Sequence, residues 1–427
     1  MFVQPANQLN GEVSVPGDKS ISHRSAIFSA ISDGTATISN YLVAEDCLST
    51  LQCIEQLGAK ITRDGTTVTI TGCGIDGLIA PTSDLDCGNS GTTARTLAGV
   101  LAGQRFRSTM VGDESLSKRP MRRIIEPIGL LGASVESNDG KLPMTLGESN
   151  LVGKEITLSV ASAQVKTCIL LAGLYASGET AVIEPTPTRD HTERMLAWLG
   201  VDVSVEQLDQ GRSIAVRGGS RLTARDINVP GDISSAAFLI VATACLPDSS
   251  ITIRNVGVNS TRTGILDVLR LCGVEIDISN AAETCNEPVA DLVVSASELR
   301  TPARLDGAII ANIIDELPIL AVLGTQLPDG LEVRGASELR VKESDRIDAI
   351  VRNLRTVGTV VDEFDDGFRV HCSNIVGGEV DSFGDHRIAM AFAVAGLLSS
   401  EGVTIRIADC TDISFPGFFE TLGSLVR

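Results

Sequence analysis

The chain has 427 residues, a formal net charge of -19, 43% hydrophobic residues and only 3% aromatic residues. This length favours two domains, and the composition predicts well-buried aliphatic cores. The acidic balance argues against nucleic acid or an anionic membrane surface as the main partner, so an anionic ligand would need local basic clusters.

The cysteines and histidines show no metal-ligand spacing. The ten cysteines form no C-x-x-C pair, and the four histidines do not pair at helical spacing. Scattered thiols of this kind are typical of a reducing compartment. Because the N-terminus lacks a basic-then-apolar leader and no uncharged apolar run is long enough to span a membrane, we expect a cytoplasmic protein without a metal.

The first predicted element is a polar turn, Asp18 to Arg24, that leads into the apolar stretch 26–31. A helix start carries free N–H groups and about half a positive charge, which suits an oxyanion. The turn adds two cations, Lys19 and Arg24, and two hydroxyls. The Val-Pro-Gly-Asp sequence at 15–18 returns at 229–232 without the lysine or the arginine, which predicts a related turn in a second domain.

Six amphipathic segments along the chain end in glycine and are followed by strand-like alternation. Glycine just past a helix end supplies the left-handed cap, so each glycine predicts the end of a helix. Spacings of 74, 68, 73, 85 and 65 residues separate Gly58, Gly132, Gly200, Gly273, Gly358 and, in a truncated repeat, Gly423.

A second pattern in the same phase consists of almost wholly apolar helices, each entered through a polar motif. A helix that is apolar on every face must be buried, so only its ends can reach a ligand. A period of this length indicates repeated supersecondary units, and six units divide as three plus three. A serine at an entrance can instead be a plain N-cap, which stays open for Ser90 and Ser234. The six entrances are 19–22, 89–93, 162–166, 232–235, 312–316 and 384–387.

The repeats therefore predict an α/β fold of two similar domains, each with three repeated βαβ-type units. One domain is expected to span 15–230, and the other to combine 1–14 with 231–427. The chain would cross between them near 15–18 and 229–232.

Several charged residues are candidates for a functional site. Lys342 and Arg346 stand at i,i+4 and would point to one side of a helix, although a surface ion network with Glu343 and Asp345 is an alternative. Lys166 at a buried entrance would be costly without an anionic partner. For Arg122 and Arg123 we favour a position on a solvated helix face.

Asp315 and Glu316 form a carboxylate pair between two apolar runs. Apolar surroundings and a like charge raise the pKa of a carboxyl group, which suits a general base. A helix-terminal cap before Pro318 is the alternative, and each member of the pair can have a different role.

Six of these motifs, in this order over essentially the whole chain, resemble those of the 5-enolpyruvylshikimate-3-phosphate synthase family. They are Asp18–Arg24, Gly88–Arg95, Ser117–Met121, Ser162–Gln164, Val341–Arg346 and Gly384–Arg387. The resemblance implies two domains whose buried parallel helices point their N-termini into an inter-domain cleft. It also implies an addition and elimination reaction between shikimate 3-phosphate and phosphoenolpyruvate, without a cofactor.

The resemblance also implies roles for individual residues. The shikimate 3-phosphate ligands would be Ser20, Arg24, Ser162, Ala163 and Gln164, with Arg189 at the shikimate ring. The phosphoenolpyruvate ligands would be Arg119, Arg346 and Arg387, with Asn89 and Gly91 lining the same pocket and Lys19 near both substrates. Asp315 would take the 5-hydroxyl proton beside Lys342, and Glu343 would protonate the methylene carbon.

The chain departs from the family pattern at two places. Some members have a lysine before a C-terminal aromatic-proline pair, whereas 412–416 has none. The segment 188–193 differs from the serine-lysine-proline-tyrosine form of other members.

Two rival functions remain at this point. One is a UDP-N-acetylglucosamine enolpyruvyl transferase, which shares the fold but usually carries a cysteine acid; 112–123 has no cysteine. The other is a non-catalytic protein that binds phosphorylated metabolites, which the presence of Asp315 and Glu343 disfavours. We expect a monomer that acts on small metabolites.

Overall fold

The computed structural model describes residues 1–302 and 304–427, which form two compact units. The N-terminal unit comprises Gly17–Val229 and the short turn Thr284–Glu287. The C-terminal unit comprises Met1–Pro16, Pro230–Glu283 and Pro288–Arg427. The turn joins two strands of the C-terminal unit, so it adds a pair of chain crossings that no sequence pattern indicated.

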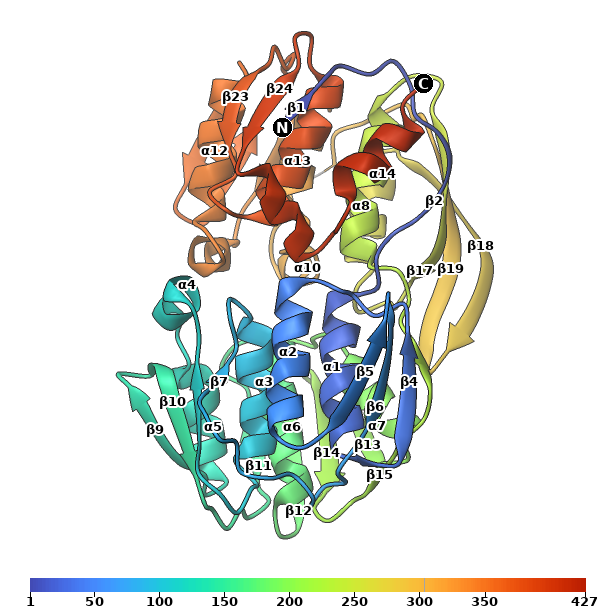
Figure 1. Ribbon diagram of the computed structural model, residues 1–427. Coiled ribbons are helices and arrows are strands. Elements are labelled where there is room, and N and C mark those ends of the chain that lie inside the picture. The colour runs from blue at the N-terminus through green and yellow to red at the C-terminus, as the bar shows by residue number, and fades with distance from the viewer. Residues whose placement is uncertain (303) are drawn as a thin grey trace. The chain divides into compact units, whose positions relative to one another are not determined.

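Three four-stranded sheets of the N-terminal unit share one strand order, which reflects three repeats (Figure 1). In each sheet the first two strands pair in parallel and the other neighbours pair antiparallel. The sheets are β16 (Ile227–Asn228), β4 (Thr35–Ser39), β6 (Thr67–Thr71) and β5 (Lys60–Asp64); β7 (Leu85–Asp86), β8 (Ser108–Val111), β10 (Lys141–Gly147) and β9 (Ser134–Asn138); and β11 (Glu155–Thr157), β12 (Glu179–Glu184), β14 (Arg212–Arg217) and β13 (Val203–Gln207). A small parallel sheet joins β15 (Leu222–Thr223) to β3 (Ser32–Asp33).

Each repeat of the N-terminal unit contributes one buried helix and one amphipathic helix. The buried helices are α1 (Lys19–Ala30), α3 (Gly91–Leu101) and α6 (Ala163–Tyr175), and α3 contacts both of the others. The amphipathic helices are α2 (Glu45–Gln56), α5 (Arg122–Leu130) and α7 (His191–Trp198), with a short α4 (Glu114–Lys118) before α5. Figure 1 shows α2 beside both α1 and α3. The polar entrances predicted at 19–22, 89–93 and 162–166 therefore contain the starts of these buried helices.

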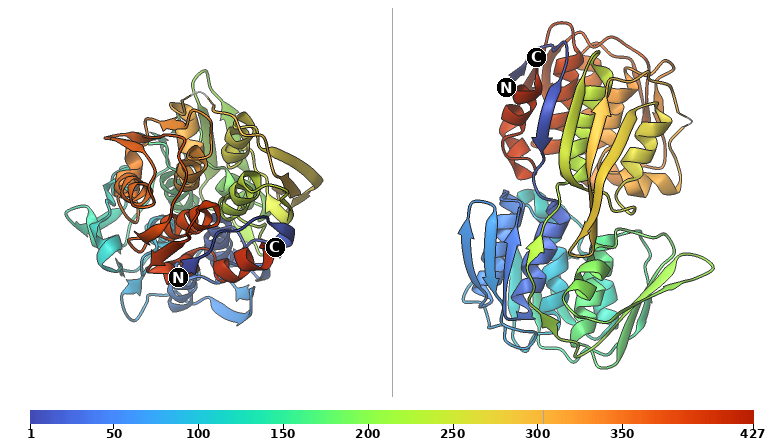
Figure 2. Two further views of the ribbon diagram at one scale, coloured as in Figure 1. Left: turned by 90° about the horizontal axis from the view of Figure 1, so that it is seen from above. Right: turned by 90° about the vertical axis from the view of Figure 1, so that its right-hand side faces the viewer.

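The C-terminal unit repeats this arrangement with less regular sheets. Its sheets are β18 (Glu275–Thr284), β19 (Glu287–Ser295), β17 (Ser250–Gly257) and β2 (Asn10–Ser14); β20 (Leu331–Val333), β22 (Gly367–Val370) and β21 (Val361–Phe364); and β1 (Phe2–Val3), β24 (Val403–Arg406) and β23 (Gly378–Asp381). A parallel bridge from Leu305 to Val333 extends the second sheet. The first residues of the chain thus supply β1 and β2 to this unit, where Figure 2 shows both termini.

The buried helices of the C-terminal unit are α8 (Ile233–Cys245), α11 (Leu317–Gly324) and α13 (His386–Leu398), which all contact one another. The amphipathic helices are α9 (Gly264–Leu271), α12 (Arg346–Thr356) and α14 (Phe418–Leu425). Short helices α10 (Ala308–Ile313), η1 (Ser337–Val341) and η2 (Ala408–Ile413) complete the unit. Each unit has its own, mainly aliphatic core. Within the described residues, no helix is long and apolar enough to cross a membrane.

The predicted helix ends and entrances are correct with two exceptions. The first five glycines have φ between 85° and 106° directly after a helix, as a left-handed cap requires. Gly423, however, lies inside α14, so it does not end that helix. The entrance expected at 312–316 is wrong for Asn312, which lies in α10, because the apolar helix begins only at Leu317.

Candidate active site

The start of α1 places two of the predicted cations of the N-terminal unit. Asp18 caps the helix by accepting a hydrogen bond from the Ile21 amide at 2.8 Å. Lys19 follows it, and its Nζ lies 2.5 Å from a carboxylate oxygen of Asp46 on α2. Arg24 lies one turn after Ser20 and donates to its carbonyl oxygen at 3.0 Å. The capping carboxylate and the cations therefore come from consecutive turns of one helix.

Arg24 is a buried cation whose described hydrogen bonds all go to neutral oxygens. Its side chain is 2% exposed and donates to the hydroxyls of Thr167 and Thr192, both at 2.9 Å. Burial lowers the pKa of Arg24 to about 10, and the nearby Arg189 contributes to the decrease. An anionic ligand would offset this unfavourable burial of positive charge. Arg189 precedes α7 and is half-buried, so the two arginines belong to one cationic region.

The starts of α3 and α6 bring Asn89, Gly91, Arg119 and Gln164 together. Arg119 donates to the Asn89 side-chain oxygen at 2.8 Å. A Cβ atom at Gly91 would lie 3.3 Å from a guanidinium nitrogen of Arg95 and 3.4 Å from one of Arg119. Glycine therefore lets two cations approach the helix start.

Arg95 and the α6 entrance complete this part of the N-terminal unit. Arg95 donates to Gln164 Oε1 at 2.7 Å, and Gln164 donates to Thr92 at 2.9 Å. Ser162 caps α6 by accepting from the Val165 amide at 3.4 Å, and Ala163 is the first residue of that helix. Sequence reasoning gave Arg95 no role, although it stands four residues after Gly91, on the same face of a helix.

Ser90 and Lys166 have structural partners. Ser90 caps α3 by accepting from the Thr93 amide at 3.1 Å, so the N-cap alternative holds for it. Lys166 is completely buried between the carboxylates of Glu184 at 3.1 Å and Glu193 at 2.6 Å. Lys166 thus has the anionic partners that its burial requires, and they belong to the protein itself.

A second cluster of predicted residues lies in the C-terminal unit around Asp315. One carboxylate oxygen of Asp315 is 3.6 Å from Lys342 Nζ and 3.6 Å from Arg346 Nη1. Arg387, the second residue of α13, donates to the main-chain oxygen of Asp315 at 3.0 Å. The structure therefore gathers three cations at the junction between α10 and α11.

Lys342 and Arg346 meet at Asp315, but they do so without sharing a helix. Lys342 directly follows the short helix η1, whereas Arg346 begins α12 after the N-cap Asp345. The prediction of one helical face was therefore wrong. The surface-network alternative also fails for Arg346, whose side chain is only 1% exposed.

Arg346 holds the carboxylates of the cluster together. Its guanidinium lies 2.7 Å from Glu343 and 2.7 Å from Asp385, the N-cap of α13. Burial alone would lower the pKa of Arg346, but the carboxylates of Asp385, Glu343 and Asp315 raise it above its ordinary value. Burial likewise opposes ionisation of Asp385, yet Arg346 keeps its pKa below the usual range.

The two members of the Asp315-Glu316 pair have different environments. Asp315 faces the cations Lys342 and Arg346, whereas Glu316 is 1% exposed and accepts a hydrogen bond from Ser234. Glu316 stands at the N-cap position of α11 without a side-chain capping bond, so the cap alternative does not describe its carboxylate.

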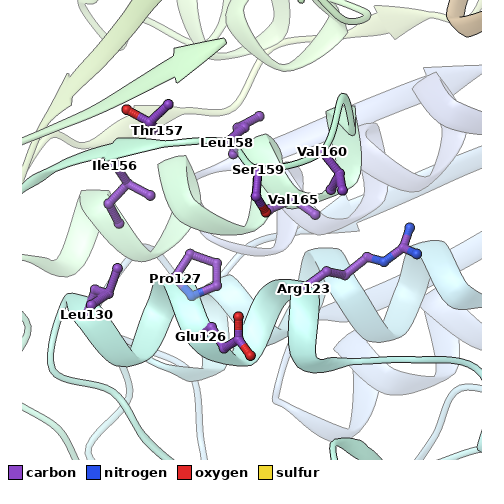
Figure 3. Close-up of a pocket in the computed structure, with 10 residues that line it drawn as sticks. All are labelled: Arg123, Glu126, Pro127, Leu130, Ile156, Thr157, Leu158, Ser159, Val160 and Val165. Carbon is purple, nitrogen blue, oxygen red and sulfur yellow. The ribbon is translucent and has the colours of Figure 1, made fainter. Parts of the chain in front are cut away.

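A pocket on the N-terminal unit contains none of the predicted site residues. Figure 3 shows it between α5 and the segment that leads to α6. Its lining residues are Arg123, Glu126, Pro127, Leu130, Ile156, Thr157, Leu158, Ser159, Val160 and Val165. Arg122 beside it forms an exposed ion pair with Asp139, as a solvated helix face predicts. Among the described residues, no group of three or more His, Cys, Asp or Glu side chains could hold a metal ion.

Comparisons with known proteins agree with this arrangement. The family model described as EPSP synthase (3-phosphoshikimate 1-carboxyvinyltransferase) matches residues 3–422. A curated 3-phosphoshikimate 1-carboxyvinyltransferase from a Geobacter species is 48% identical over 428 residues, covering 100% of this chain and 99% of the relative. One from Xanthomonas oryzae pv. oryzae is 50% identical over 413 residues, covering 96% of this chain and 93% of the relative.

Solved structures give the same result for the fold. The structure of EPSP synthase from Acinetobacter baumannii superposes with a TM-score of 0.89 at 41% identity, covering 100% of this chain and 98% of that chain. The enolpyruvyl transferase NikO from Streptomyces tendae has the same fold, with a TM-score of 0.79 at 19% identity and coverage of 99% and 96%. The chain therefore belongs to the EPSP synthase (3-phosphoshikimate 1-carboxyvinyltransferase) family.

Proposed function

We propose that the chain transfers the enolpyruvyl group of phosphoenolpyruvate to the 5-hydroxyl of shikimate 3-phosphate and releases phosphate. This reaction makes the protein a transferase of the shikimate pathway, as its family membership supports. The observation that carries the assignment of roles is the approach of Lys342 and Arg346 to the Asp315 carboxylate, each at 3.6 Å. A carboxylate beside two cations is suited to accept a proton where negative charge develops.

The N-terminal unit supplies the shikimate 3-phosphate site in this proposal. The buried Arg24 is a phosphate ligand whose existing partners are hydroxyls, so the ligand would restore its balance of charge. Arg189 contacts the shikimate ring of the same substrate. The remaining ligands are Ser20, Ser162, Ala163 and Gln164.

Phosphoenolpyruvate is a dianion or trianion, so it needs several cations. Arg119 and Arg387 bind its carboxylate and phosphate, while Lys19 lies near both substrates. Asn89 orients Arg119 through their 2.8 Å hydrogen bond, and Gly91 leaves room for that guanidinium. Arg346 is the further phosphoenolpyruvate ligand from the C-terminal unit.

The chemistry has two stages. In the addition, the 5-oxygen bonds to C2 of phosphoenolpyruvate, Asp315 takes the hydroxyl proton, and Glu343 donates a proton to C3. In the elimination, the bond from C2 to the phosphate oxygen breaks and C3 returns a proton to Glu343. Phosphate leaves with the proton that Asp315 took from the hydroxyl, which restores both carboxyl groups. Lys342 and the arginines stabilise the charge of the tetrahedral intermediate.

Arg346 links substrate binding to the proton donor. Its 2.7 Å ion pair with Glu343 joins a proposed phosphoenolpyruvate ligand to the proposed acid. Binding of the anionic substrate to Arg346 would compete with this ion pair.

The proposal is tested by phosphate release from phosphoenolpyruvate with and without shikimate 3-phosphate. We expect release only when both substrates are present, and without an added metal. Turnover of UDP-N-acetylglucosamine would support the other transferase, and binding of both ligands without phosphate release would support a binding protein. Either result would refute the proposed reaction.

We further propose that the protein acts as a cytoplasmic monomer on free metabolites. Each of the ten cysteines is a free thiol, as a reducing compartment would maintain. Light scattering on the eluting peak of a sizing column tests the monomer directly.

A further inference from the structure

A line of buried polar side chains crosses the C-terminal unit from the loop before α9 to Arg387. Arg262 in that loop is 3% exposed and lies 2.7 Å from the Ser234 hydroxyl and 3.1 Å from Asp232. Ser234 in turn donates to Glu316, whose carboxylate lies 4.0 Å from Arg387. Four of these five residues are at most 5% exposed, so the line is shielded from solvent.

The hydrogen bonds of this line can run in only one direction. A guanidinium has donors and no acceptor, so Arg262 donates to the Ser234 oxygen. A serine hydroxyl has one proton, which must then point to the Glu316 carboxylate. Arg262 therefore sets the orientation of the Ser234 hydroxyl, and the hydroxyl holds one oxygen of Glu316.

Helix capping does not account for this line. Asp232 is the N-cap of α8 and accepts from the Ser234 amide at 2.8 Å. The cap alternative considered for Ser234 is therefore wrong, because its hydroxyl bonds to Glu316 instead. Two buried carboxylates balance the charge of Arg262. Asp232 pairs with the guanidinium directly, and Glu316 interacts with it through the Ser234 hydroxyl.

The line ends at two groups of the candidate site. Glu316 is the chain neighbour of Asp315, and Arg387 bonds to the main-chain oxygen of Asp315 at 3.0 Å. A movement of Glu316 would therefore shift both the position of Asp315 and the electrostatic partner of Arg387.

We propose that Arg262 is a positioning residue for the phosphoenolpyruvate half of the reaction, acting through Ser234 and Glu316 on Arg387 and Asp315. This inference rests on the proposed function. The part of Arg262 is to hold the C-terminal cluster in one arrangement. Shikimate 3-phosphate, which the N-terminal unit binds in the proposal, should not depend on it.

The test compares Arg262→Gln, Arg262→Lys and Ser234→Ala with the wild-type chain in steady-state assays, and measures shikimate 3-phosphate binding by calorimetry. A small misplacement of reacting groups costs on the order of a hundred-fold, so we expect kcat/KM for phosphoenolpyruvate to fall about that far in Arg262→Gln. The dissociation constant of shikimate 3-phosphate should not change. Arg262→Lys keeps the charge and several donors, so it should recover much of the loss.

Ser234→Ala and one control variant keep the test decisive. Ser234→Ala retains both charges and breaks only the relay, so it should reproduce the loss for phosphoenolpyruvate even where Arg262→Gln fails to fold. Arg254→Gln removes an arginine that pairs with Glu12 and Asp291 at the surface of the same unit, and it should leave the kinetic constants unchanged.

The outcomes separate this inference from the proposed function. Wild-type constants in a folded Ser234→Ala variant would overturn the relay. An equal loss of shikimate 3-phosphate binding in Arg262→Gln would also overturn it, since that result would indicate general damage. A wild-type chain that releases no phosphate would instead refute the proposed reaction.

Discussion

Replacing Asp315 with asparagine removes the proposed base while it keeps the shape of the site. Asparagine has nearly the same volume, and the main-chain oxygen that accepts from Arg387 at 3.0 Å remains. The change leaves Lys342 and Arg346, both 3.6 Å from the replaced oxygen, without this carboxylate. The variant therefore tests proton transfer with little change in the phosphoenolpyruvate ligands.

General acid–base catalysis contributes about 10²–10⁴-fold, so we expect kcat to fall about 10³-fold in Asp315→Asn. That decrease corresponds to about 4 kcal/mol of activation free energy. KM for phosphoenolpyruvate should change little, because the cations that bind it remain. Binding of shikimate 3-phosphate should be unaffected, because its proposed ligands belong to the N-terminal unit.

The assay is single-turnover phosphate release by rapid quench, with calorimetry for shikimate 3-phosphate and a thermal melt as a measure of folding. Asp329→Asn is the matched control, because Asp329 is an exposed carboxylate of the same unit to which no role in binding or catalysis is assigned. A folded Asp315→Asn variant whose rate lies within about ten-fold of wild type would contradict the assignment, because even the weakest general base contributes more.

Three further predictions concern other residues. Glu343→Gln should lower kcat about 10²–10⁴-fold in the same rapid-quench assay while phosphoenolpyruvate still binds, since the amide cannot donate its proton to C3 as an acid does; an unchanged rate would exclude Glu343 as the donor. Gly91→Ala should raise KM for phosphoenolpyruvate, because the new methyl group would lie 3.3 Å from a guanidinium nitrogen of Arg95 and 3.4 Å from one of Arg119; an unchanged KM in steady-state kinetics would contradict this reason. Lys166→Met should lower the free energy of unfolding by about 3–5 kcal/mol, because Glu184 and Glu193 lose a buried cation, and a urea titration with an unchanged midpoint would show that the pair contributes nothing.

The sequence predicted the repeats well because their signals are local. The glycine after each of five helices is needed for a left-handed backbone, and the alternation in 67–71 buries Val68 and Ile70 on one face of β6. Gly423 failed as a signal because glycine inside a helix is tolerated when the surrounding residues pack well.

The contacts of the site were harder to predict from the sequence, because the interacting residues lie far apart in the chain. Arg346 meets Asp385 across 39 positions, and Lys166 meets Glu193 across 27. Residue type showed that a buried Lys166 needed an anionic partner, but no local pattern identified Glu184 or Glu193 as that partner, and none indicated that Arg346 is buried. The Ser234 hydroxyl was equally ambiguous, since only the structure shows that Asp232 has already capped the helix.

Strand β1 has a consequence for how the chain folds during synthesis. Phe2 and Val3 pair with Thr404 and Val403, and the N-terminal amine donates to the Ile405 oxygen at 2.9 Å. Residues 2–3 therefore leave the ribosome long before their partners at 403–404, and they must wait for these before their sheet can form. The stretch 17–229 emerges complete long before that point and can fold first, as N-terminal domains generally do. A ribosome that stalls before β24 should thus carry a finished N-terminal unit and an open C-terminal unit, in which β1 still lacks its partner strand.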